Sequence, residues 1–96
     1  MDKKREISEE CFYKTAAALE DKAEAESFFK ALCTEKEVQL IAQRLYVAKL
    51  LSENRVYSDI VEQTGASSAT VSRVKRAMAA DREYFKRLLE KLNELL

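Results

Sequence analysis

The sequence predicts an all-α fold of about six helices, and three observations support that prediction. The 96 residues include no Pro and a single Gly, Gly65, so the residues that interrupt helices are nearly absent. Ala, Leu, Glu and Lys, which favour helices, are abundant. Apolar residues also recur every three or four positions over most of the chain. We therefore expect one all-helical domain over residues 1–96.

The N-terminal third predicts two helices. The first is expected over about residues 8–19, and the second follows Asp21. The second helix carries one apolar stripe: Ala25, Phe28, Phe29 and Leu32. Because the chain has no His and no Cys-x-x-Cys, we expect Cys11 and Cys33 to be reduced thiols in the core, with no metal site and no disulfide.

A third helix is predicted from Thr34 to about Glu53. Thr34 and Glu37 have the spacing of a capping box, in which each side chain accepts a hydrogen bond from the other residue's backbone N–H. The apolar residues of this helix are too many for one narrow stripe: Val38, Leu40, Ile41, Ala42, Leu45, Tyr46, Val47, Ala48, Leu50 and Leu51. The other short helices of one chain could scarcely cover them all, so we expect a homodimer.

Residues 57–76 have the pattern of a helix-turn-helix. The first helix has an inward face of three residues: Ile60, Val61 and Thr64. Gly65 can adopt the positive φ that ends this helix, and Ser67 or Ser68 is the expected N-cap of the second. The residues that would dock the second helix on the first are Val71, Val74 and Met78.

The last helix is expected to begin after Asp81, which is a good N-cap. It carries one apolar side: Phe85, Leu88, Leu89, Leu92, Leu95 and Leu96. We expect this side to pack into the core or across the subunit boundary.

The distribution of charge indicates where a polyanion would bind. Residues 1–37 hold 7 basic and 10 acidic side chains, whereas residues 65–80 carry three cations and no acid. Small and hydroxylated side chains allow a helix to enter the major groove, so the predicted base-reading residues are Ser68, Ala69 and Ser72. The predicted phosphate contacts are Ser58, Thr70, Arg73, Lys75 and Arg76.

Three motifs in this order resemble a known family. They are Leu-x-Thr-x-x-Glu from Leu32, Gln43-Arg44, and Gly-Ala-x-x-Ala-Thr-x-x-Arg from Gly65. Over roughly residues 28–80 the chain resembles the Trp repressor and its relatives, especially the shorter regulators with no assigned ligand. The resemblance implies an intertwined six-helix homodimer whose recognition helices enter successive major grooves of double-stranded DNA.

The resemblance also implies an effector pocket. The residues that surround tryptophan in that family correspond by motif to Thr34, Arg44 and Arg73. Each has an alternative role, as a helix cap, an ion-pair partner and a phosphate contact respectively. Where the family has a Gly against the indole ring, this chain has Val74, which would fill that space. We therefore expect DNA binding without a corepressor, or with a ligand other than tryptophan.

One rival function remains open. A dimeric helical module could bind an acidic protein through Arg73, Lys75 and Arg76. An enzyme is not expected, because the chain has no His and no Gly-rich phosphate loop. No apolar run approaches the roughly 20 residues needed to cross a bilayer, and no signal core follows the N-terminus. We expect a transcriptional repressor in the cytoplasm, associated with the nucleoid.

Overall fold

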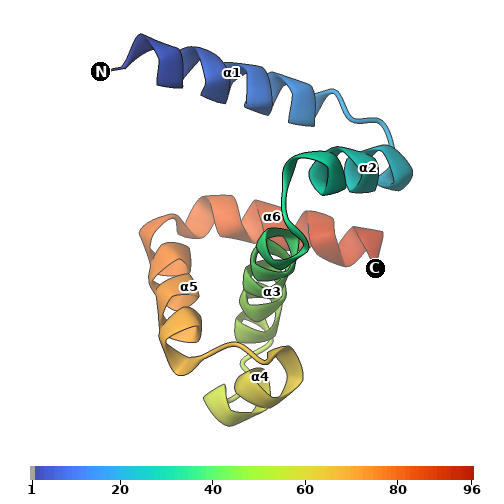
Figure 1. The fold of residues 1–96 in the computed structure, drawn as a ribbon. Helices are drawn as coiled ribbons and strands as arrows, with labels where there is room; N and C mark the ends of the chain where they lie inside the picture. The colour runs from blue at the N-terminus through green and yellow to red at the C-terminus, as the bar shows by residue number, and fades with distance from the viewer. Residues whose placement is uncertain (1) are drawn as a thin grey trace. The chain divides into compact units, whose positions relative to one another are not determined.

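The computed structural model describes residues 2–96 and shows six α-helices (Figure 1). They are α1 (Lys3–Ala17), α2 (Lys22–Leu32), α3 (Glu35–Ser52), α4 (Tyr57–Thr64), α5 (Ser68–Ala80) and α6 (Arg82–Leu95). No strand occurs within residues 2–96, so the all-α prediction is confirmed. The chain divides into two compact units, the first ending at Val38 and the second running from Gln39 to Leu96.

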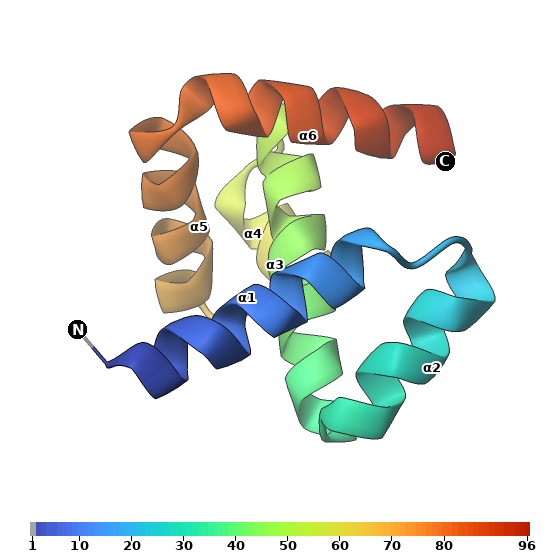
Figure 2. The same cartoon turned by 90° about the horizontal axis from the view of Figure 1, so that it is seen from above.

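The first unit contains α1 and α2, joined by a short turn (Figure 2). α1 begins at Lys3, earlier than predicted, because the Asp2 side chain accepts a hydrogen bond from the Lys4 N–H at 3.0 Å and caps the helix. Four aromatic rings form a cluster with centroid distances of 5.2–6.4 Å: Phe12, Tyr13, Phe28 and Phe29. Neither helix has a buried residue.

Cys11 corrects one expectation. Both cysteines are free thiols, but Cys11 is exposed on α1 and Cys33 is only half-buried at the end of α2. The prediction that both lie in the core is wrong for the single chain, because Cys11 lies on an exposed side of α1 and Cys33 is the C-cap of α2.

The capping box before α3 is confirmed. The Thr34 hydroxyl accepts from the Glu37 N–H at 3.1 Å, and the Glu37 carboxylate accepts from the Thr34 N–H at 2.8 Å. The bond from the Thr34 backbone lowers the pKa of Glu37. A lowered pKa favours the charged form in the folded state. The cap therefore contributes fully above the ordinary pKa of Glu, and this contribution is lost as the pH falls through the lowered value.

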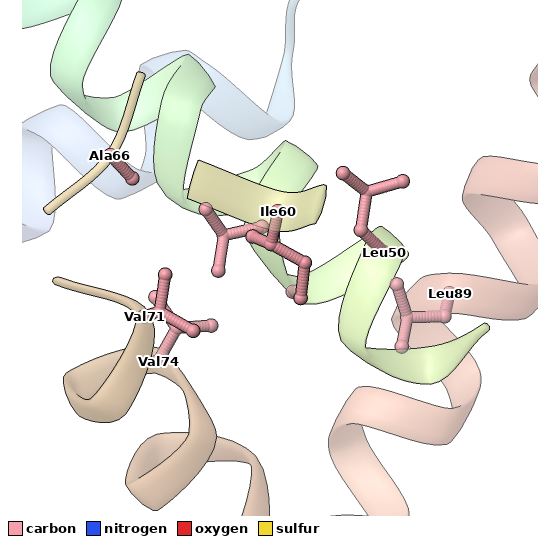
Figure 3. Packing of buried hydrophobic residues seen from close by; sticks show 8 residues of the cluster. Leu50, Ile60, Ala66, Val71, Val74 and Leu89 are labelled. Atoms are coloured by element: carbon pink, nitrogen blue, oxygen red, sulfur yellow. The ribbon is translucent and has the colours of Figure 1, made fainter. Parts of the chain in front are cut away.

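The second unit holds the hydrophobic core (Figure 3). Its buried residues come from α3, α4, the turn after α4, α5 and α6: Val47, Ala48, Leu50, Ile60, Ala66, Val71, Val74 and Leu89. Leu51, Met78, Phe85 and Leu92 pack against them. α4 packs on α5, and α5 packs on α6. The predicted docking residues Val71, Val74 and Met78 are therefore confirmed.

One apolar expectation is wrong in this unit. Val61 was expected to face inward with Ile60, but its side chain is 37% exposed whereas that of Ile60 is fully buried. The apolar side of the last helix is expected to pack into the core or across the subunit boundary, and in the single chain Leu95 and Leu96 are exposed at the end of α6, so for these two residues only packing across the boundary stays a prediction. The N-cap of α6 is as predicted, since the Asp81 side chain accepts from the Tyr84 N–H at 3.2 Å. No helix within residues 2–96 has the length and apolar character to span a membrane.

Candidate nucleic-acid interface

α4 and α5 form the two helices of the predicted helix-turn-helix. Gly65 ends α4 in the left-handed region, at φ 72°, and its N–H donates to the Val61 carbonyl at 2.9 Å. Of the two serines proposed as the next cap, the structure selects Ser67, whose hydroxyl accepts from the Thr70 N–H at 3.1 Å. The turn is thus built as the sequence predicts.

Thr64 and Gln43 hold this turn in place. The Thr64 hydroxyl donates to the Ile60 carbonyl at 2.6 Å and accepts from the Ala66 N–H at 3.1 Å. The Gln43 side-chain amide on α3 donates to the Thr64 carbonyl at 3.0 Å. The role of Gln43 was not predicted, because its partner lies 21 positions away and helical periodicity carries no signal of such a bond.

Replacing Gly65 with alanine is expected to lower the free energy of unfolding by about 1–2 kcal/mol. The reason is the positive φ and not crowding, since an added Cβ would meet only the Gln43 amide nitrogen at 3.9 Å, an ordinary contact. Gly65→Asn is the control, because Asn tolerates the left-handed region better than Ala. Urea unfolding of the three proteins measures the difference. An asparagine variant less stable than the alanine variant would show that space, not φ, limits this position.

The outward side of α5 is small and uncharged at its N-terminal end. Val71 and Val74 are buried, so the opposite side of the helix faces away from the core. Helical spacing places Ala69, Ser72 and Arg76 on that opposite side. Ser68 and Ala69 are exposed, and Ser72 is half-buried. Ser68 lies at the edge of this outward side. The three predicted base-reading residues therefore lie at one end of one helix.

The predicted phosphate contacts differ in their exposure and in whether they already have an interaction partner within the protein. Arg73, Lys75 and Arg76 are exposed, and within residues 2–96 none of them lies within 4.0 Å of a carboxylate oxygen. Ser58 is exposed in the first turn of α4. Thr70 is half-buried, and its hydroxyl lies 3.1 Å from that of Ser67, so it already has a partner within the helix.

Tyr57 is a residue of this surface that the sequence did not reveal. The Lys75 ammonium lies 5.6 Å from the centroid of the Tyr57 ring, a cation–π distance. The contact joins the first residue of α4 to the middle of α5. It draws Lys75 toward α4, whereas Arg76 lies on the outward side of α5.

The predicted effector pocket remains a prediction. Thr34 belongs to the first unit and caps α3, while Arg44 and Arg73 belong to the second unit and are exposed. Val74, the residue expected to fill the space of an indole ring, is buried in the core with 6% of its surface exposed. Its side chain therefore packs within the hydrophobic core of the second unit.

Known proteins resemble this chain over nearly its whole length. Residues 8–93 match the model of the family described as Trp repressor protein. The chain is 38% identical over 94 residues to the uncharacterized protein YerC of Bacillus subtilis (strain 168), which covers 98% of this chain and 90% of YerC.

Two crystal structures have a similar fold. One is a TrpR like protein from Eubacterium eligens ATCC 27750, with a TM-score of 0.82 and 42% sequence identity, covering 88% of this chain and 87% of that one. The other is a protein from Staphylococcus aureus provisionally described as a Trp repressor. Its TM-score is 0.84 and its identity 34%, and the match covers 91% of this chain and 87% of that one.

Proposed function

This chain belongs to the Trp repressor protein family, and from that membership we propose that it is a transcriptional regulator that reads the major groove of double-stranded DNA with α5. One observation carries the proposal. The N-terminal end of α5 presents Ser68, Ala69 and Ser72 outward, next to three cations that no carboxylate of residues 2–96 neutralises. A slender helix end of this kind enters a groove about 12 Å wide, and the cations attract phosphates.

In this proposal the chain acts as one domain and makes two classes of contact with DNA, one with bases and one with phosphates. Ser68, Ala69 and Ser72 read base edges, with the hydroxyls forming hydrogen bonds and the methyl group contacting thymine. The residues that contact phosphates are Ser58, Thr70, Arg73, Lys75 and Arg76. The regulator is a repressor in the cytoplasm, bound to the nucleoid.

We further propose that it binds DNA as an intertwined homodimer. α3 leaves Ile41 57% exposed and Leu45 40% exposed, one turn apart on one side of the helix. A second copy would cover these side chains and place a second α5 on the same duplex, with half-sites about 34–36 Å apart. The burial of Val74 favours binding without tryptophan.

Selection of bound duplexes from a random pool at stated salt, with and without tryptophan, tests this function. We expect a palindrome with half-sites one helical turn apart, recovered equally under both conditions. Recovery of random sequences, or no recovery, would remove the proposal of sequence-specific binding. Enrichment only with tryptophan would instead assign it the role of corepressor.

The rival function is binding of an acidic protein, and Ala69→Phe distinguishes the two. A phenylalanine at the groove-facing end of α5 should weaken binding to the selected duplex at least about tenfold, because each disturbed base contact costs about 1–3 kcal/mol. Ala79→Phe, farther along α5, is the matched control and should bind DNA normally. Fluorescence anisotropy measures both. If Ala69→Phe binds the duplex as tightly as the native protein, α5 does not enter the groove through this end.

A further inference from the structure

All three glutamines of the chain line one cleft. The cleft lies between α3 and α4 and has a volume of about 500 Å³, within the range of small-molecule sites. α3 contributes one face with helical spacing: Gln39, Ala42, Gln43 and Tyr46. α4 contributes Gln63 and Thr64 from its last turn. The sequence contains no other glutamine.

The walls of this cleft are uncharged and combine apolar surface with amide and hydroxyl groups. Of the residues that the structure describes, six line the cleft, and none of these is Asp, Glu, Lys or Arg. No wall residue offers an opposite charge to an ion, so the walls favour a neutral ligand. Gln39 and Gln63 each have two N–H donors and a carbonyl acceptor side by side, and Gln43 keeps one N–H and its carbonyl, which matches a ligand with adjacent N–H and C=O groups. The ring of Tyr46, 44% exposed, offers a face on which a planar ligand stacks.

The cleft is separate from the other proposed surfaces. It shares no residue with the predicted effector pocket of Thr34, Arg44 and Arg73. Helical spacing centres its α3 face more than a quarter turn from Ile41 and Leu45, the side proposed for the second subunit, and only Ala42 borders Leu45 at i, i+3 spacing.

One wall of the cleft is coupled to the helix-turn-helix. Gln43 donates to the Thr64 carbonyl, one residue before the Gly65 turn. Every other side-chain hydrogen bond found in residues 2–96 joins residues no more than four positions apart. A ligand held by Gln39 on α3 and Gln63 on α4 would add a second tie between the same two helices.

We propose that this cleft binds a small, planar, neutral molecule with adjacent N–H and C=O groups, such as a pyrimidine base or an aromatic carboxamide. The ligand bridges α3 and α4 and so stabilises the helix-turn-helix in the arrangement described. Its effect on DNA affinity rests on the proposed function, but binding itself does not.

The test uses the native protein without DNA and two pairs of probes. Uracil and nicotinamide are neutral, while orotate and nicotinate are their carboxylate analogues. The chain has five side-chain carboxamides, and Asn54 and Asn93 lie outside the cleft as internal controls. Side-chain NH₂ resonances report each group separately by NMR. We expect 10 mM uracil or nicotinamide to shift the glutamine signals only, with a Kd on the order of 1 mM, and to raise Tm by about 5 °C.

Variants locate the binding. Ala42→Phe fills the cleft, and Gln63→Met removes a carboxamide at similar volume. Each should weaken uracil or nicotinamide binding at least about tenfold, whereas Asn93→Met should not change it. No shift of any glutamine signal, equal shifts with orotate and nicotinate, or unchanged binding in both cleft variants would overturn the proposal. Because these measurements contain no DNA, they separate its failure from a failure of the proposed regulator function.

If the cleft binds a probe and the duplex selection also succeeds, the probe should raise the affinity for the selected duplex. Titration of that duplex at saturating uracil or nicotinamide measures this effect. An unchanged affinity would leave a binding site that does not regulate DNA binding, and would overturn the coupling through Gln43 and Thr64.

Discussion

Ile60→Ala is expected to lower the free energy of unfolding by about 2–5 kcal/mol. Ile60 is fully buried, and it contributes the side chain of α4 to a core built from four helices and a turn. Removing its outer carbons leaves a cavity in this core that the short α4 can close only in part. For a domain of this size the loss is a large share of the total stability. Thermal and urea unfolding by circular dichroism measure it.

The neighbouring residue supplies the control. Val61→Ala removes similar atoms from a side chain that is 37% exposed, so we expect a change of about 0.5 kcal/mol or less. Alanine also has the higher helix propensity, which offsets part of the loss. If the two variants lose equal stability, Ile60 does not anchor α4 and the orientation of the helix-turn-helix rests on other contacts.

Ile41→Glu combined with Leu45→Glu is expected to convert the proposed dimer into a monomer. A twofold interface through this side of α3 would bury four new carboxylates, and each buried charge without a partner costs several kcal/mol. The dimer Kd should rise at least about 1000-fold. Light scattering at micromolar concentration should then report 11.0 kDa and not twice that mass.

DNA binding should fall with the dimer. Loss of the linked second half-site should weaken binding to the selected palindrome at least about 100-fold. Ile41→Val with Leu45→Ile keeps the apolar surface and is the matched control, expected to remain dimeric. A native protein that is itself monomeric, or a glutamate variant that stays dimeric, would show that this side of α3 is not the interface.

Local chemistry made much of this fold predictable. The capping box of Thr34 and Glu37, the caps at Ser67 and Asp81, and the positive φ of Gly65 each depend on residues within four positions. Such signals are complete in a short stretch of sequence. For the same reason the six helices and the helix-turn-helix could be located before the structure was known.

Burial was harder to predict for an apolar residue at the edge of the apolar face of its helix. Val61 follows Ile60 directly, and rotation by about 100° per residue takes it from the core to the surface. Cys11 is a residue type that is usually buried, yet α1 exposes it. In both cases the residue type indicates a preference for burial. Whether the residue is buried depends on whether another element covers that side of its helix.

From the sequence alone follow the helical class, the boundaries of α3 to within one or two residues and of α1 only to within five, the turn at Gly65 and the resemblance to a family. These depend on backbone preferences and hydrogen bonds between near neighbours, which the order of residues specifies directly. The Gln43 bond to Thr64, the Lys75 contact with Tyr57 and the cleft that gathers three glutamines required the folded coordinates. Each joins residues from different helices, and helical periodicity describes the faces of one helix without stating which face of another it meets.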